Sequence, residues 1–148
     1  MEKKILLIGD ANSPHIHGLV NAIKKHNERI IIDIMTVLPV TRRPDVDSIF
    51  QPSFYNWYCT NFKRGAGKIR LISYLFIIFF QLKKYNTIQI HFVYPYLSHI
   101  IKFLKTKTDK IVPIFWGSDI FRLENDDWGK VNKIIKECDS INCSTVEM

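Results

Sequence analysis

The sequence lacks most of the short motifs that identify a known chemistry. It has no G-x-x-x-x-G-K-[ST] phosphate loop and no G-x-S-x-G nucleophile elbow. Its three cysteines, Cys59, Cys138 and Cys143, have no metal-ligand spacing, and their odd number argues against a disulfide framework. These absences disfavour P-loop enzymes, α/β-hydrolases and zinc-bound domains, and they favour a reducing, cytoplasmic compartment.

Glycine is missing where a dinucleotide enzyme needs it. In ILLIGDANSPHIHGLV, residues 5–20, only Gly9 follows the strand-like apolar run, whereas a dinucleotide fingerprint requires G-x-G-x-x-G. Gly9 allows a tight exit from the strand, and the helix start offers unpaired N–H groups to a phosphate. Polar side chains, Asn12, Ser13 and His15, occupy the remaining turn. We therefore expect no cofactor here, and a ligand with many hydroxyl groups.

Long apolar runs are also missing. The most hydrophobic stretch, LISYLFIIFF at 71–80, is far shorter than the roughly 20 apolar residues of a spanning helix, so it favours a buried core helix. Basic residues on both sides, Lys68, Arg70, Lys83 and Lys84, keep a helix on an anionic membrane surface as the alternative. The N-terminal MEKK leads directly into a strand-like run, so no signal peptide is apparent.

Acidic residues are few compared with basic ones. The chain has 14 Asp and Glu against 21 Lys and Arg, a formal net charge of +7. Such a balance favours an anionic partner: nucleic acid, a phosphorylated small molecule or an acidic membrane. The basic residues are spread over several loops and match no nucleic-acid motif, so no nucleic-acid partner is expected.

Short apolar strands alternate with amphipathic helices. Strands are predicted at 4–9, 30–37, 87–93, 111–115 and from 140. Apolar residues at i, i+3, i+4 and i+7 predict helices from Ser13 to about Asn27, through 97–104 and through 131–138. The hydrophobic helix should end near Tyr85, and the proline-punctuated 38–68 is expected to be irregular. Together these predict one α/β domain, 1–148, with a Rossmann-like parallel sheet and helices on both faces.

In such sheets the ligand lies outside the carboxyl ends of the strands. This rule nominates the segments just after each strand, which are GDANSPHIHG, TVLPVTRR, HFVYPY, WGSDIF and CSTVE. The candidate residues within them are Gly9, Asn12, Ser13, His15, His91, Trp116, Gly117, Ser118 and Asp119. Purely structural roles stay open for most of them: Asn12, Ser13, Ser118 and Asp119 as turn or cap residues, His15 as a surface histidine and His91 as a core histidine. His15 and His17 are two residues apart on a helix and point to different sides, so no metal site is expected.

Four stretches, in order, resemble the N-terminal domain of GT-B glycosyltransferases of the group 1 (family 4) kind. They are KILLIGDANSPHIHGLVNAIKKH, IQIHFVYPY, IVPIFWGSDIF and CDSINCSTVEM; the resemblance spans most of the chain, and residues 38–85 contribute little to it. The chain departs from the pattern at Trp116, where many relatives have a histidine that touches the donor sugar. That role is therefore not assigned here.

The resemblance implies a metal-independent, configuration-retaining enzyme that moves a sugar from a nucleotide sugar to a saccharide or glycolipid acceptor. In such enzymes this half mainly holds the acceptor, while a second domain, with a donor-binding E-x-x-x-x-x-x-E region, holds the nucleotide sugar. That region is absent, so we do not expect this chain alone to catalyse transfer. A location at the inner membrane face, with a lipid-linked acceptor, is the accompanying hypothesis. The alternative is a non-catalytic binding or scaffold module that partners another glycosyltransferase subunit.

Overall fold

A computed structural model describes residues 3–36, 38–61, 66–116 and 123–144. Six strands form one sheet in the order β3-β2-β1-β4-β5-β6, with all neighbours parallel. The strands are β1 (Lys4–Gly9), β2 (Ile31–Thr36), β3 (Ser48–Phe50), β4 (Thr87–His91), β5 (Ile111–Trp116) and β6 (Asn142–Ser144). The predicted α/β, Rossmann-like class is confirmed.

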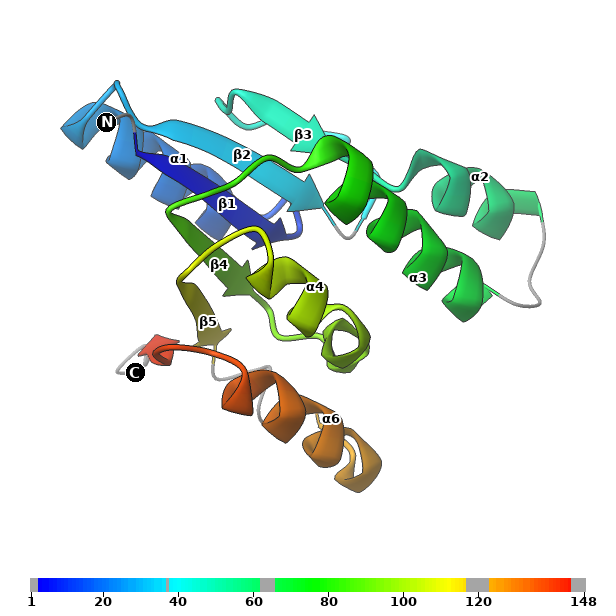
Figure 1. Ribbon diagram of the computed structural model, residues 1–148. Coiled ribbons are helices and arrows are strands. Elements are labelled where there is room, and N and C mark those ends of the chain that lie inside the picture. The colour runs from blue at the N-terminus through cyan, green and yellow to red at the C-terminus, as the bar shows by residue number, and fades with distance from the viewer. Residues whose placement is uncertain (1–2, 37, 62–65, 117–122, 145–148) are drawn as a thin grey trace.

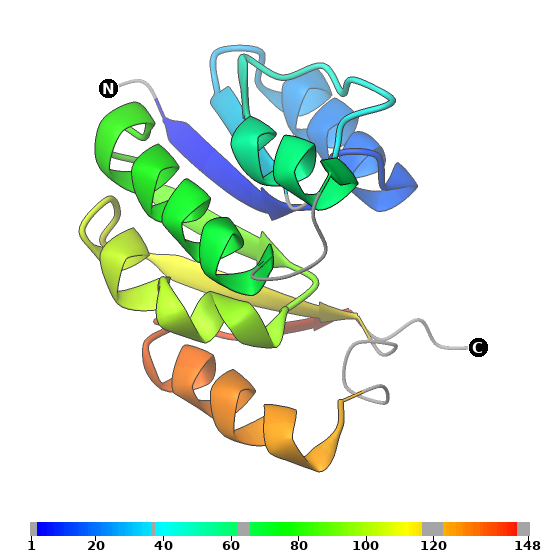
Figure 2. The same ribbon diagram turned by 90° about the vertical axis from the view of Figure 1, so that its right-hand side faces the viewer.

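Helices cover both faces of the sheet, as predicted (Figure 1, Figure 2). They are α1 (Pro14–His26), α2 (Ser53–Asn61), α3 (Ala66–Phe76), the π-helical turn η1 (Ile77–Gln81), the 3-10 helix η2 (Pro95–His99), α4 (Ile101–Lys105) and α6 (Asn125–Lys136). On one face α1 packs Ile16 and Val20 against Leu7 of β1. On the other, α3, η1, α4 and α6 pack against Leu6 and Ile8. Alternate residues of β1 therefore enter two cores, which explains its continuous apolar run.

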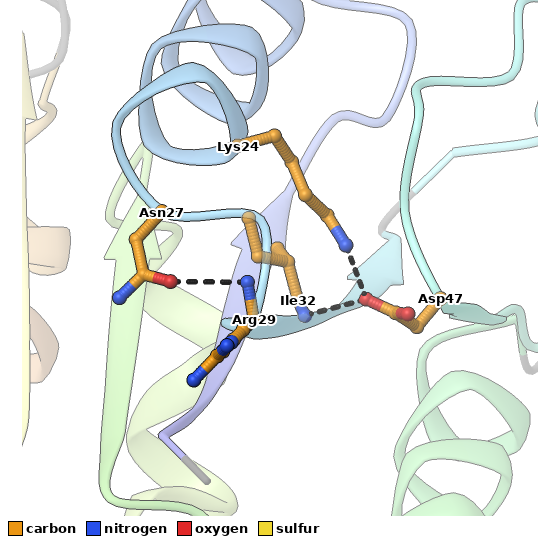
Figure 3. Close-up of polar contacts among 5 residues, drawn as sticks. All are labelled: Lys24, Asn27, Arg29, Ile32 and Asp47. Atoms are coloured by element: carbon orange, nitrogen blue, oxygen red, sulfur yellow. Dashed lines mark hydrogen bonds and ion pairs between the residues drawn. The ribbon is translucent and has the colours of Figure 1, made fainter.

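The segment 38–61 is more regular than expected. It contains the edge strand β3 and the helix α2, so the expectation of irregular structure here was wrong. Asp47 attaches β3 to its neighbour: its carboxylate accepts hydrogen bonds from the Ile32 backbone N–H at 2.8 Å and from Lys24 Nζ at 2.9 Å (Figure 3). Burial alone would raise the pKa of Asp47, but these two partners outweigh it and lower the pKa. A three-residue strand thus depends on a side chain outside it.

Two helices differ from the prediction: one ends earlier, and the other is divided into two segments. The hydrophobic helix ends at Gln81 rather than near Tyr85, because Leu82 adopts an extended backbone with ψ of 131°. The predicted helix through 97–104 is split into η2 and α4, with Ile100, at φ of −115°, forming a turn between them. Ser13 and Pro14 occupy the N-cap and first helical position as predicted, although the Ser13 side chain makes no capping hydrogen bond. Within the described part of the chain, no helix has the length and apolarity needed to cross a bilayer.

Candidate functional site

The strand order reverses between β1 and β4, and a cavity of about 520 Å³ lies beyond the carboxyl ends of these two strands. Its walls come from the β1–α1 turn, the segment after β4 and the beginning of α6. The residues that line it are Asp10, Asn12, Ser13, Pro14, Phe92, Val93, Tyr94, Pro95, Leu123 and Asp127. Open α/β sheets bind ligands at such a reversal point. We call this space the switch-point cavity.

Hydrogen bonds from Asn12 hold the β1–α1 turn in place. Its Oδ1 accepts from Thr41 N at 2.7 Å, from Thr41 Oγ1 at 2.9 Å and from Arg42 N at 3.0 Å. Its Nδ2 donates to Pro39 O at 2.8 Å and to Asp10 Oδ1 at 3.0 Å. Asn12 lines the cavity, yet these bonds engage both ends of its amide. Its main effect is to join the turn to the loop that follows β2.

The carboxylate of Asp10 closes the same turn. Its Oδ1 accepts the backbone N–H of Asn12 at 2.9 Å, and its carbonyl oxygen accepts the N–H of Ser13 at 3.0 Å. Asp127 lies across the cavity on the first turn of α6, where Lys130 donates to its Oδ1 at 2.8 Å. The cavity therefore presents two carboxylates beside the N-terminus of α1. Carboxylate oxygens accept hydrogen bonds from hydroxyl groups.

Phe92 forms an apolar wall through an unusual backbone. Among the described residues other than glycine, it alone has a positive φ, 60°. This conformation is costly for a bulky residue, by about 1–2 kcal/mol, and such strain is concentrated at functional sites. Because the chain leaves β4 with this positive φ, the ring of Phe92 lines the cavity. The same ring packs against Trp116, with the two ring centroids 6.0 Å apart.

Tyr94 completes the aromatic wall. Its ring stacks on Tyr96 at 5.6 Å, and Tyr96 stacks in turn on the buried Tyr74 of α3 at 5.8 Å. The guanidinium of Arg70 lies 4.9 Å from the centre of the Tyr96 ring. Burial raises the pKa of Tyr74 to about 12, so its hydroxyl stays protonated in the physiological range. The wall is thus supported from behind by α3.

His91 is a buried histidine at the end of β4, with 2% of its surface exposed. Its Nε2 lies 3.3 Å from Gln89 Oε1, whereas its Nδ1 has no hydrogen-bond partner among the described residues. Burial lowers the pKa of His91 to about 4, so the ring is neutral at pH 7. With the proton on Nε2, Nδ1 is a bare acceptor.

A second cavity, of about 450 Å³, lies on the α1 side of the sheet. It is lined by His15, Leu19, His91, Ile114, Trp116, Ile141, Asn142 and Cys143. The rings of His15 and Trp116 are in contact, with centroids 4.4 Å apart. The sequence-nominated residues are therefore divided: Asn12 and Ser13 line the switch-point cavity, whereas His15, His91 and Trp116 line its neighbour. Gly9 ends β1 and lines neither of these two cavities, and Gly117, Ser118 and Asp119 fall outside the described residues.

Asp10, Phe92 and Tyr94 lie in the segments nominated from the sequence but were not singled out there as candidate residues, and Asp127 lies outside those segments. Asp10 directly follows Gly9, and Phe92 and Tyr94 directly follow His91, so position after a strand was a signal for all three. Asp127 carries no such signal, because it lies in the first turn of α6 rather than directly after a strand, and it lines the cavity only because of where α6 packs.

No family model matches the chain, and no curated protein matches it. The glycosyltransferase resemblance therefore stays a prediction. Among the described residues, no three His, Cys, Asp or Glu side chains lie close enough together to hold a metal ion.

Proposed function

We propose that this chain is the acceptor-binding half of a glycosyltransferase, and that the switch-point cavity holds a saccharide acceptor. The observation that carries the proposal is the pairing of two carboxylates, Asp10 and Asp127, with an aromatic wall in one cavity of about 520 Å³. A sugar ring offers hydroxyl donors to the carboxylates and an apolar C–H face to the wall. The volume is within the range of small-molecule sites.

The two carboxylates favour hydroxyl groups over phosphate at this position. A phosphate near Asp10 and Asp127 would meet like charges, although the N-terminus of α1 attracts anions. The acceptor hydroxyl, rather than the nucleotide diphosphate, is thus the better ligand for this wall. In this proposal the nucleotide sugar binds to a separate donor domain, and transfer requires both parts.

Saccharide binding tests the proposal. The labelled chain is screened on an oligosaccharide array, and the strongest ligand is titrated by calorimetry against Asp127→Ala and Asp126→Ala. The two aspartates are neighbours on α6, but only Asp127 lines the cavity. A lost hydrogen bond to a charged group is worth about 1.5–3 kcal/mol, so we expect Asp127→Ala to weaken binding by about 10- to 100-fold. Asp126→Ala should bind as the unchanged chain does.

Absence of saccharide binding, or equal affinity of both variants, would overturn the proposal. Transfer is examined separately by adding nucleotide sugars and following release of the nucleoside diphosphate, with and without a donor domain supplied in trans. Saccharide binding that never leads to release would favour the non-catalytic module over the enzyme half.

A further inference from the structure

We propose that an exposed apolar strip on α2, α3, η1 and α4 docks this protein onto an anionic lipid bilayer. The strip consists of Phe54, Ile72, Phe76, Phe79, Phe80 and Phe103. Phe80 is 77% exposed and Ile72 is 64% exposed, values that are high for large apolar side chains. A contiguous exposed apolar surface of this kind indicates an interaction site.

The strip is continuous across helices that lie side by side (Figure 2). The Phe76 and Phe80 ring centroids are 5.0 Å apart, and Phe79 meets Phe103 of α4 edge-on at 5.4 Å. At the other end, Phe54 of α2 lines a groove of about 400 Å³ together with Ile72 and Phe76. The groove and the ring contacts join the side chains into one surface.

The helix that carries the strip is apolar on both sides. Tyr74, Ile77 and Ile78 enter the core, so the predicted core role of 71–80 accounts for one side. A surface helix ordinarily presents charged residues on the opposite side. Here that side presents Phe76 and Phe80 instead, and core packing does not account for them.

The charge around the strip indicates an anionic partner. No Asp or Glu occurs between Asp47 and Asp109, a segment that includes α2, α3, η1 and α4 and that contains nine Lys and Arg residues. Lys83 and Lys84 are exposed and follow the C-cap residue of η1, Leu82. Lysines near an anionic membrane surface are attracted to it, and aromatic side chains partition into the interfacial region. A second copy of the chain would bring the same basic segment against this one, which disfavours self-association through the strip.

The docking surface is independent of the proposed sugar-transfer function. The strip and the switch-point cavity share no residue. Lipid binding can therefore fail while saccharide binding succeeds, and the reverse.

Vesicle co-sedimentation tests the proposal with the full chain. The probes are vesicles of phosphatidylcholine alone and of phosphatidylcholine mixed with phosphatidylglycerol, at low and high salt. We expect binding to the mixed vesicles at low salt, with binding about tenfold weaker for Phe80→Ser and about 30-fold weaker for Lys83→Gln/Lys84→Gln. The matched controls are Ile141→Ser, an exposed apolar residue outside the strip, and Lys25→Gln/Arg29→Gln, which removes the same charge from exposed positions at and beyond α1.

Circular dichroism verifies that each variant is folded, which exposed substitutions should allow. The proposal is overturned if the chain does not bind mixed vesicles, if it binds neutral vesicles equally well, or if the control variants lose as much binding as the strip variants. Sedimentation velocity provides a further overturning result: a dimer that Phe80→Ser converts to monomer, without lipid binding, would assign the strip to a second copy.

Discussion

Gly9, the last residue of β1, lies directly against the backbone of His91, the last residue of β4. A Cβ atom placed on Gly9 would stand 3.1 Å from the His91 carbonyl oxygen and 3.2 Å from the His91 Cβ. The glycine therefore allows close approach of the two strands, and this approach sets the position of both walls of the switch-point cavity. A tight exit from the strand was the predicted reason for glycine at this position, and the close approach to His91 is a second reason.

We expect Gly9→Ala to destabilise the protein by about 1–3 kcal/mol, because both nearest atoms belong to a buried, well-packed segment that must shift. Gly18→Ala is the matched control: nothing lies within 4 Å of its added Cβ in α1, so helix propensity should make it neutral or stabilising by up to about 1 kcal/mol. Urea unfolding of the two variants gives the comparison. Equal effects would show that the contact with His91 is unimportant.

Asn12 should be a structural residue of the site rather than a ligand-binding one. Asn12→Ala leaves the N–H groups of Thr41 and Arg42 without their acceptor, and we expect a loss of about 1–2 kcal/mol in the free energy of unfolding. Hydrogen exchange at these two amides should accelerate, while exchange in β5 should not change. A variant that unfolds as the unchanged chain does, with normal exchange at Thr41, would contradict the assignment.

The buried hydrogen-bonded pair of Tyr85 and Asp33 provides a third test. Tyr85 donates its hydroxyl hydrogen to Asp33 Oδ2 at 2.7 Å, and Asp33 Oδ1 has no partner among the described residues. Burial, with the neighbouring carboxylate, raises the pKa of Tyr85 far above its usual value. Tyr85→Phe removes this hydrogen bond from Asp33, and we expect a cost of about 2–3 kcal/mol.

The double variant Asp33→Val/Tyr85→Phe removes both polar groups. It should cost less than the sum of the two single changes, because no buried polar group loses its partner. Urea unfolding of all four proteins gives the coupling energy. Strict additivity would mean that the hydrogen bond contributes nothing to stability.

The sheet was predictable because its long strands are largely buried on both faces and are therefore mostly apolar, as in the KILLIG run of β1. The strand β3 was not predictable, because three residues are too few to show a periodic apolar pattern. Its pairing is supported by the Asp47 side chain, which lies outside the strand. The end of the hydrophobic helix at Gln81 was missed for a related reason: neither glycine nor proline follows it, and Leu82 becomes extended without a local signal.

The candidate site was predictable in place but not in detail. Alternating strands and helices already predict a parallel sheet, and the ligand site of such a sheet lies at the carboxyl ends of its strands, where the strand order reverses. The separation of His15 from Ser13 follows from the helix, since residues two apart are rotated by about 200° around its axis. The positive φ of Phe92 has no counterpart in residue type, so its ring could not be assigned to the cavity from sequence.

The buried neutral ring of His91 should make stability depend on pH. Its pKa of about 4 in the folded protein lies below the ordinary value of 6.5, so the unfolded chain binds more protons between these values. The contribution of His91 to the free energy of unfolding is therefore complete above pH 6.5. It is lost as the pH drops toward 4, and the loss is about 3 kcal/mol at most. His91→Gln cannot take up this proton, so its unfolding free energy should fall less over the same range, whatever its value at pH 7. The exposed His26→Gln serves as control and should keep the slope of the unchanged chain. Urea unfolding at pH 4.5, 5.5 and 7 gives the slope of the unfolding free energy against pH for each of the three proteins. Equal slopes for His91→Gln and the unchanged chain would show that His91 takes up its proton in the folded state.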